Sequence, residues 1–274
     1  ATPIPRTLTM TAFGDLRVSV IKTMPPGRKP VETHLAKIGN EQKVYDFVER
    51  ELQAGHQAYF VYPLINKSDR MELKDAQQMH RRLAGEIFPD YRVELVHSRK
   101  KEEEKEKIMG DFAKGDVDIL VATSVVEVGV DVANATCMVV EHAERFGLSA
   151  LHQLRGRVGR SGYQSFVFLV YHPDLTDAGK ERLRVMKESN DGFVIAEKDL
   201  AIRGPGDLSG TRQSGFIRFT IAELVRDSEV LIQAKNDVET LMKKDPGLEQ
   251  EDSAFLRRLM KEAPPFPEEP AGTA

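Results

Sequence analysis

Residues 118–162, DILVATSVVEVGVDVANATCMVVEHAERFGLSALHQLRGRVGRSG, are the stretch that decides the fold. They contain two short apolar runs, at 119–121 and 138–140, of the kind that is buried in a parallel sheet. A loop with glycine separates the runs, and a helical pattern follows, for which Ser149 is the expected N-cap. Strand, loop, strand and helix in this order predict the βα units of a sheet covered by helices.

The expected helix carries three polar side chains at spacings of four and three residues, which predicts one shared face for Gln153, Arg157 and Arg160. Gly156 and Gly159 lie between them, and a residue without a side chain lets a ligand or a backbone approach closely. The planar fork of arginine binds phosphate oxygens in pairs, so this face favours an anion such as a nucleoside triphosphate. A solvated polar face is the alternative interpretation.

The composition is that of a globular protein with a hydrophobic core. Of 274 residues, 41% are hydrophobic and 30% are charged, and the net charge of −4 argues against nucleic-acid binding through bulk positive charge. No apolar run approaches the roughly 18 residues that span a membrane, and no signal peptide opens the sequence, so we expect a cytoplasmic protein. The single cysteine, Cys137, excludes a disulfide within the chain, and no Cys/His cluster has the spacing of metal ligands.

Strand and helix patterns alternate regularly between residues 31 and 173. The expected strands lie at 31–35, 58–64, 92–97, 117–123, 137–142 and 165–171, and the expected helices at 41–53, 75–88 and from 102 onward. This alternation predicts an α/β fold with a mainly parallel sheet. In such sheets ligands bind beyond the carboxyl ends of the strands, where Tyr62, His97 and Thr123 are expected.

The pattern changes after residue 173. Residues 176–188 and 219–242 are expected to be helical, whereas residues 203–207 (RGPGD) are expected to lack regular structure. Residues 67–74 are expected to form a polar loop, and the proline-rich end of the chain a flexible tail. Prolines at 25, 26 and 30 predict a stiff linker before the sheet.

Two groups of motifs resemble a known family. Residues 123–131, followed by QLRGRVGR at 153–160, resemble motifs V and VI of superfamily 2 helicases. Residues 2–8 (TPIPRTL), 25–30 (PPGRKP) and 141–147 (EHAERFG) resemble, within that superfamily, the RecG family of ATP-dependent DNA helicases. The resemblance implies a RecA-like parallel sheet with helices on both faces, followed by a smaller, mainly helical domain.

The resemblance also divides the chain into five parts. Residues 1–24 would be the end of a first motor domain, carrying a remnant of motif III with Thr2 and Arg6. The linker at 25–30 would be followed by a second RecA-like domain (31–173), a translocation-motif domain (174–245) and a C-terminal tail (246–274). Arg182, Arg203 and Gln213 match the translocation motif, which in the family converts motor closure into movement along DNA.

Roles at the nucleotide follow from the resemblance. Arg157 and Arg160 would be arginine fingers that reach the γ-phosphate of ATP, with Gln153 helping to order the same site. Gly129 and Asp131 match the pair in motif V that approaches the nucleotide.

Roles at the DNA backbone follow in the same way. Thr123 and Ser124 would hold a phosphate through hydroxyl and N–H groups. His97 and Arg99 occupy a second backbone-binding motif, in which Ser98 departs from the glycine that the family often carries.

The sequence lacks the other half of such a motor. It contains no G-x-x-x-x-G-K-[ST] loop and no Asp-Glu dipeptide, the features that hold phosphates and Mg²⁺ in the first motor domain. We therefore expect a fragment that is inactive as an ATPase alone and uses ATP with Mg²⁺ only within the full-length enzyme. Its expected partners are branched or forked double-stranded DNA, the first motor domain and an N-terminal wedge domain, with no membrane.

The favoured function is the C-terminal half of a DNA helicase and double-strand translocase that remodels stalled replication forks. Three alternatives stay open from the sequence. They are the same region of the transcription-repair coupling factor, a non-catalytic interaction module on a RecA-like scaffold, and a metabolic nucleotide-binding enzyme.

Overall fold

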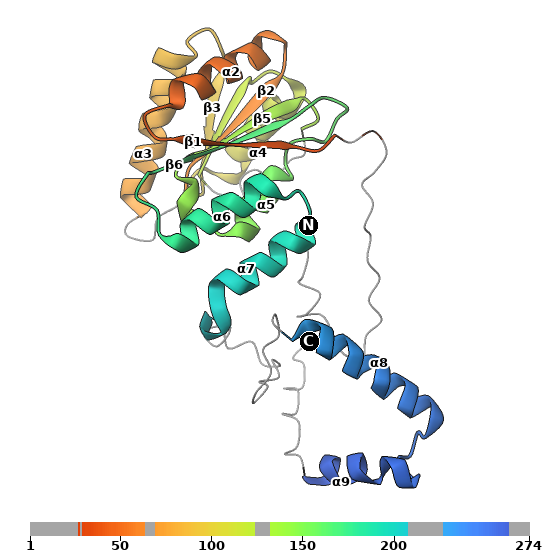
Figure 1. Cartoon of the computed structure of the whole chain (residues 1–274). Helices are drawn as coiled ribbons and strands as arrows, with labels where there is room; N and C mark the ends of the chain where they lie inside the picture. Colours follow the sequence, from red (N-terminus) through yellow and green to blue (C-terminus); the bar gives the residue numbers. More distant parts are fainter. Residues whose placement is uncertain (1–26, 28, 64–68, 124–131, 208–226, 263–274) are drawn as a thin grey trace. The chain divides into compact units, whose positions relative to one another are not determined.

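The computed structural model describes residues 27, 29–63, 69–123, 132–207 and 227–262. These residues fall into two compact units, 27–202 and 203–262, and each is described by itself. The first unit contains a six-stranded sheet in the order β1-β6-β5-β2-β4-β3, with every neighbouring pair parallel (Figure 1). The strands are β1 (Glu32–Lys37), β2 (Gln57–Val61), β3 (Val93–Val96), β4 (Ile119–Ala122), β5 (Ala135–Val140) and β6 (Phe166–Tyr171).

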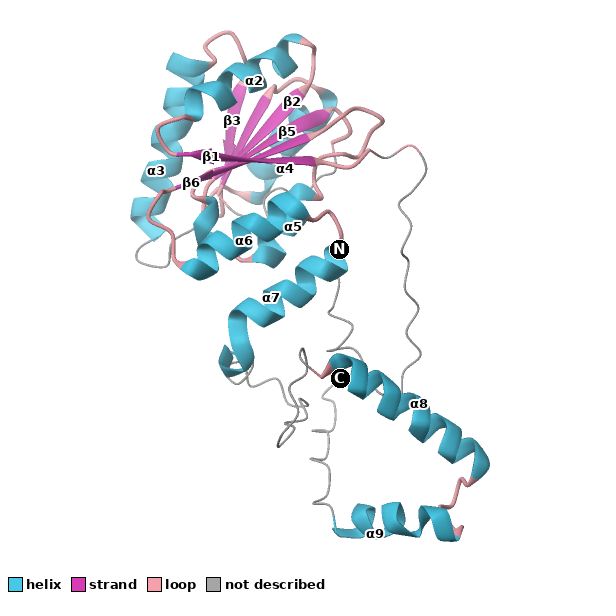
Figure 2. Cartoon of the chain, in the orientation of Figure 1, coloured by secondary structure: helices cyan, strands magenta, loops and turns pink. Residues whose placement is uncertain are grey.

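Helices cover both faces of this sheet, which confirms the expected α/β architecture (Figure 2). One face packs against α2 (Glu41–Gln53) and α3 (Asp69–Arg82), the latter continued by the π-helical turn η1 (Leu83–Ile87). The other face packs against α4 (Glu102–Lys114), α5 (Leu148–Arg155), α6 (Asp177–Glu188) and the first part of α7 (Gly192–Asp207). Because both faces are covered, the residues of the central strands β2, β4 and β5 are all buried.

Local sequence explains where α4 begins and ends. Its first turn carries Glu102, Glu103 and Glu104, whose negative charges are favourable at the positive end of a helix dipole. Gly115 ends the helix with a φ of 85°. Glycine adopts this left-handed conformation readily, whereas a residue with a side chain does so at a cost. Phe112 is fully buried and lies 4.9 Å from Tyr59 of β2, ring centroid to ring centroid.

Three sequence-based expectations for these elements are wrong. The polar stretch at 67–74 enters α3 at Asp69, because residues such as Arg70, Glu72 and Lys74 favour helix without any apolar pattern. Residues 203–207 complete α7 rather than interrupt it, although Pro205 has no N–H to donate within the helix. The N-cap of α5 is Gly147, not Ser149.

The second unit consists of helical segments. After the end of α7 the described residues form α8 (Ser228–Lys244), the short η3 (Glu251–Ser253) and α9 (Ala254–Glu262), which lies within the stretch expected to be a tail. Asp245 ends α8, and its carboxylate accepts hydrogen bonds from the backbone of Glu249 and Gln250 at 2.9 and 3.0 Å. No helix in the described part of the chain has the length and apolar character needed to cross a membrane.

Phe112→Ala tests the importance of the core between α4 and the sheet. Removing a fully buried phenylalanine side chain leaves a cavity, so we expect the free energy of unfolding of the chain to fall by about 3–5 kcal/mol. Phe255→Ala removes a phenylalanine side chain that is 60% exposed. This change should alter the free energy of unfolding by less than about 0.5 kcal/mol. Urea denaturation of both variants gives the comparison, and equal effects would contradict this description of the core.

Candidate nucleotide and nucleic-acid sites

The two candidate phosphate-binding arginines lie in a loop, not on a helix. Helix α5 ends at Arg155, and the backbone N–H of Arg157 donates to the carbonyl of Leu154 at 2.9 Å in a closing turn. The expected helical face shared with Gln153 is therefore wrong. The helix has ended before the chain reaches Gly159, whose φ of 72° lies outside the right-handed helical region.

This arginine loop, residues 156–160, is held against the sheet. A Cβ atom on Gly159 would lie 2.7 Å from Val31 Cγ2 and 3.8 Å from Ser165 Cβ. Val31 directly precedes β1 and Ser165 directly precedes β6, so the loop lies at the amino-terminal edge of the sheet. Within the loop, Nε of Arg160 donates to the carbonyl of Gly156 at 2.9 Å.

The candidate DNA-binding residues lie at the opposite, carboxyl-terminal edge. Thr123 follows β4 and His97 follows β3, and the preceding residues Ala122 and Val96 are direct partners in the parallel ladder. The structure therefore brings Thr123 and His97 together, with the N–H of Arg99 donating to His97 Nδ1 at 3.2 Å. Thr123 itself is buried, with 3% of its surface exposed.

The two groups of residues are thus separated by the length of the strands. Strands of four to six residues span about 13–20 Å at the usual rise per residue. The sequence-based expectation named Tyr62, His97 and Thr123 at the carboxyl ends of the strands, whereas the arginine loop lies at the other edge. Helix α5 crosses from one edge to the other and connects them.

Several predicted residues cannot be placed. Gly129, Asp131, Ser124, Gln213, Thr2 and Arg6 lie outside the described residues. Arg203 lies in the backbone of α7, and nothing is described of its side chain.

Arg182 is the translocation-motif residue whose side chain is described. It lies on α6, where Nη1 donates to the carbonyl of Phe146 at 2.9 Å and Nε to that of Ala178 at 3.3 Å. Phe146 ends the short 3₁₀ turn η2 (Ala143–Arg145) and directly precedes Gly147, the N-cap of α5. Arg182 therefore ties α6 to the start of the helix that leads to the arginine loop.

Sequence reasoning did not identify Glu141 as an individual site residue. It follows β5 at the carboxyl-terminal edge, is 4% exposed, and its N–H donates to Val61 of the neighbouring strand β2 at 2.9 Å. Burial, reinforced by the nearby Glu41, raises the pKa of Glu141 to about 7, while Arg82 opposes the shift. Burial likewise raises the pKa of Tyr62, which follows β2, with Glu141 as a further cause. The signal in the sequence was an acidic residue directly after an apolar strand.

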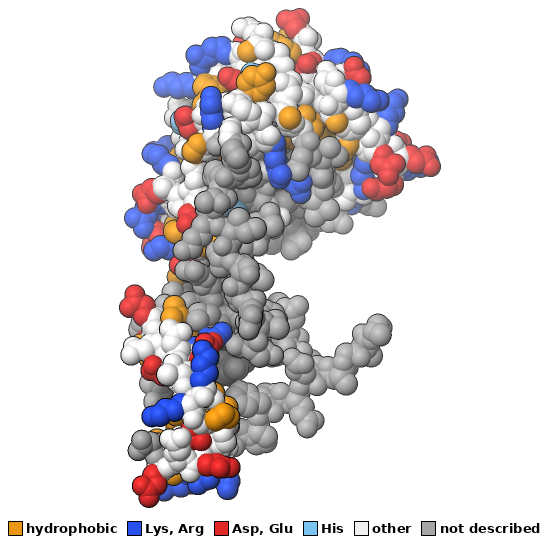
Figure 3. All heavy atoms as spheres, turned by 90° about the vertical axis from the view of Figure 1, so that its right-hand side faces the viewer, with side chains coloured by type: hydrophobic (Ala, Val, Ile, Leu, Met, Phe, Trp, Pro, Cys, Tyr) orange, Lys and Arg blue, Asp and Glu red, His pale blue; other side chains and the backbone are white. Residues whose placement is uncertain are grey.

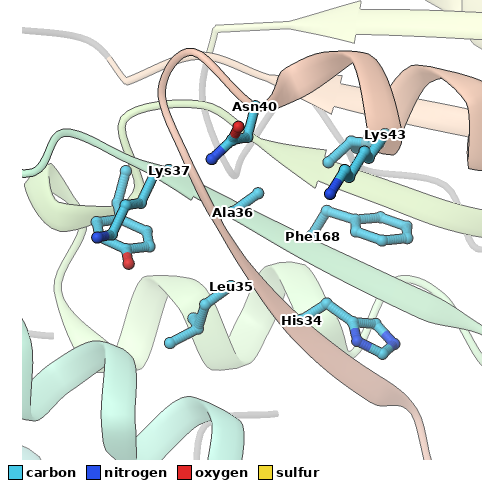
Figure 4. A pocket seen from close by; sticks show the side chains of 9 residues that line it. His34, Leu35, Ala36, Lys37, Asn40, Lys43 and Phe168 are labelled. Carbon is cyan, nitrogen blue, oxygen red and sulfur yellow. The ribbon is translucent and has the colours of Figure 1, made fainter.

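A hollow of about 390 Å³ lies around the edge strand β1, separate from both candidate sites. Figure 4 shows Asn40 and Lys43 beside the turn between β1 and α2. None of the predicted site residues borders the hollow, which is lined by His34, Leu35, Ala36, Lys37, Asn40, Lys43, Val44, Phe168 and Tyr171.

Charge and metal-ligand chemistry give no separate site. On the face visible in Figure 3, lysine and arginine side chains of the described residues are interspersed with aspartate and glutamate and form no single basic patch. Within the described ranges, no group of three or more His, Cys, Asp or Glu residues could hold a metal ion.

Comparison with known proteins identifies close relatives. Residues 40–162 match the helicase conserved C-terminal domain, and residues 189–264 match the family described as ATP-dependent DNA helicase RecG, domain 3, C-terminal. The RecG helicase of Borreliella burgdorferi is 53% identical over 94% of this chain and 38% of its own length. That of Synechocystis is 49% identical over 95% of this chain and 31% of its own length.

A solved structure supports the same relationship. The structure of RecG bound to a three-way DNA junction is 47% identical in sequence and superposes with a TM-score of 0.66. The match covers 84% of this chain and 29% of that protein. The chain thus spans about a third of the length of the relatives it matches.

Gly159→Ala tests the anchoring of the arginine loop. Alanine at a φ of 72° costs about 1–2 kcal/mol, and its Cβ would also press on Val31 at 2.7 Å. We therefore expect the free energy of unfolding to fall by at least about 1 kcal/mol, measured by urea denaturation. Gly162→Ala is the matched control, because its Cβ would meet open space, and it should have little effect. Similar effects at the two glycines would show that the loop is not held against Val31.

Glu141→Gln tests the buried carboxyl. Because its pKa rises from 4.5 unfolded to about 7 folded, the folded chain binds more protons between these pH values. The free energy of unfolding should therefore fall as pH rises through this window, by up to roughly 3 kcal/mol. Glutamine stays neutral, so the variant should lose this part of the decline. Urea denaturation between pH 4.5 and 8 gives the free energy of unfolding of both proteins. If it declines equally with pH in the wild type and in Glu141→Gln, the raised pKa of Glu141 is refuted.

Proposed function

Because the chain belongs to the RecG family of ATP-dependent DNA helicases, we propose that it forms the C-terminal part of such a motor. In the full-length enzyme it would be the second RecA-like domain with the adjoining translocation segment. The whole would be a double-strand DNA translocase that remodels stalled forks and branched DNA in the cytoplasm. Branched DNA is proposed as its substrate because the structure of the related RecG contains a bound three-way DNA junction.

The arginine loop is the observation that carries this proposal. Two guanidinium groups, Arg157 and Arg160, follow each other closely in a loop that Gly159 and Val31 hold at the edge of the sheet. Fixed cations of this kind stabilise the charge that develops on phosphoryl oxygens in the transition state. The nucleotide and its Mg²⁺ would be bound by the first motor domain, and Mg²⁺ would neutralise charge on the β- and γ-phosphates.

Other residues would complete the nucleotide side. Gln153, in the last turn of α5, would help to order the γ-phosphate site. Gly129 and Asp131 would approach the nucleotide from the segment before β5. The loop can complete an active site only together with a domain that holds the triphosphate, so the chain alone would not hydrolyse ATP.

The carboxyl-terminal edge would hold the DNA backbone. His97 and Thr123 lie at the ends of paired strands, and Ser124 and Arg99 adjoin them in sequence. Backbone N–H groups, hydroxyls and a guanidinium at one edge suit the phosphates of a single tracked strand. A few contacts of this kind are compatible with the net charge of −4, because the chain would not depend on overall positive charge to attract DNA.

The remaining motif residues would link the two sides. Arg182, Arg203 and Gln213 would form the translocation motif, and Thr2 and Arg6 would belong to motif III of the first motor domain. The five-part division of the chain stated above belongs to the same proposal. A wedge domain elsewhere in the full-length protein would engage the branch point.

Arg157→Ala and Arg160→Ala in the full-length helicase test the arginine assignment. Loss of one transition-state arginine should lower kcat for DNA-stimulated ATP hydrolysis by about 10³-fold or more, with a much smaller change in KM. Steady-state ATPase assays with forked DNA measure both constants.

The control is Arg258→Ala on α9, an exposed arginine paired with Glu262 at 3.5 Å, which should leave ATP turnover unchanged. Unchanged turnover in Arg157→Ala and Arg160→Ala would instead favour a non-catalytic module on a RecA-like scaffold.

A further inference from the structure

Arg155 is a third arginine beside the arginine loop, and it faces the protein interior. It is the last residue of α5 and only 4% exposed. Its Nη1 donates to the carbonyl of Met186 at 3.0 Å and to that of Ser189 at 2.7 Å. Both acceptors lie at the carboxyl end of α6, more than thirty residues further along the chain.

The surroundings of Arg155 are those of a buried cation held by a helix end. Burial lowers its pKa to about 10, so the guanidinium is still charged at neutral pH. Within the described residues its hydrogen-bond acceptors are carbonyls, and its Nη2 has no partner. The last carbonyls of a helix carry partial negative charge, which compensates the cation in place of a carboxylate. An arginine in this setting is costly unless these contacts are kept.

Two further contacts fix the other end of α5. Arg182 of α6 donates to Phe146 just before α5, and the hydroxyl of Ser149 donates to Asp199 Oδ2 of α7 at 2.8 Å. Helix α5 is therefore tied to α6 near both of its ends, and to α7 near its start. Ser149 lies inside α5, directly after its first residue, and its hydroxyl makes this contact with α7 instead of capping the helix.

The arginine loop has an independent attachment to the sheet. Val158 is fully buried in the core, and Gly159 packs against Val31. Removing the contacts of Arg155 would thus release the end of α6 while the arginine loop keeps its place. A substitution of Arg155 should therefore leave ATP hydrolysis in place and impair the transmission of its effect to α6 and α7.

We propose that Arg155 is a positioning residue that couples the arginine loop to the α6–α7 segment, so that the two move as one body. This inference rests on the proposed motor function and adds to it a residue that touches neither nucleotide nor DNA. A purely structural role would give a different result, because loss of a merely stabilising contact lowers the melting temperature without changing the number of forks unwound per ATP hydrolysed. Stability and coupling can therefore be measured apart.

The experiment uses the full-length helicase with Arg155→Met and Arg155→Lys. We measure the melting temperature, kcat and KM for ATP with forked DNA, and forks unwound per ATP hydrolysed. For Arg155→Met we expect a somewhat lower melting temperature, because the carbonyls of Met186 and Ser189 lose their donor, with KM within twofold and kcat within about threefold. We expect unwinding per ATP to fall at least tenfold. Lysine keeps a positive charge and N–H donors, but its side chain is shorter and its ammonium lacks the planar guanidinium geometry. Arg155→Lys should therefore keep only part of the contact with the two carbonyls and give an intermediate value.

Arg184→Met is the matched control on α6. Arg184 is exposed and bonded to Glu181 at 2.7 Å, so its loss should leave the unwinding per ATP unchanged. The proposal is overturned if Arg155→Met loses ATP hydrolysis and unwinding in equal proportion, or if its unwinding per ATP stays normal. If Arg155→Met does not fold, normal unwinding per ATP in a folded Arg155→Lys overturns it, and a reduced ratio supports it. The motor function itself is tested by a different experiment: unchanged ATP turnover in Arg157→Ala would contradict it.

Discussion

The parallel hydrogen-bond ladder of the six strands is the constraint on which the rest of the structure depends. Every strand must leave the sheet at one edge and the chain must return to the other edge before the next strand begins. Residues that follow strands therefore gather at the carboxyl-terminal edge, as His97 and Thr123 do. Residues that precede strands gather at the opposite edge, where the arginine loop packs on Val31. One sheet thus presents two chemically different edges.

Helix α5 turns this separation into a connection. It begins beside the carboxyl-terminal edge, ends at the arginine loop, and is bonded to α6 at both ends through Arg182 and Arg155. These bonds join backbone carbonyls to guanidinium groups, so they depend on the position of the helices rather than on a matching acidic side chain. A helix held in this way can carry a displacement at one edge to the segment beyond α6. The proposed motor function and the proposed role of Arg155 both rest on that arrangement.

The sequence predicted elements whose pattern is local, and missed contacts that are not. The bounds of α2 were predicted correctly, and α4 was located from its acidic start and buried residues, because apolar spacing and end signals lie within each segment. Arg157 and Arg160 were wrongly placed on α5, since the left-handed conformation of Gly159 and its close approach to Val31, 128 positions earlier, leave no periodic pattern in the sequence. The partners of Arg155 lie 31 and 34 residues away, and carbonyl acceptors leave no mark in the sequence.

The proposed division of the sheet into a nucleotide edge and a DNA edge is tested most directly by amide hydrogen exchange in the full-length helicase. The measurement compares peptides that cover residues 96–101 and 119–123 with a peptide that covers residues 153–160, after addition of forked DNA or of a non-hydrolysable ATP analogue. The account predicts that DNA alone protects the first two peptides and the nucleotide alone protects the third. Protection of residues 153–160 by DNA alone, with no response to the nucleotide, would contradict it.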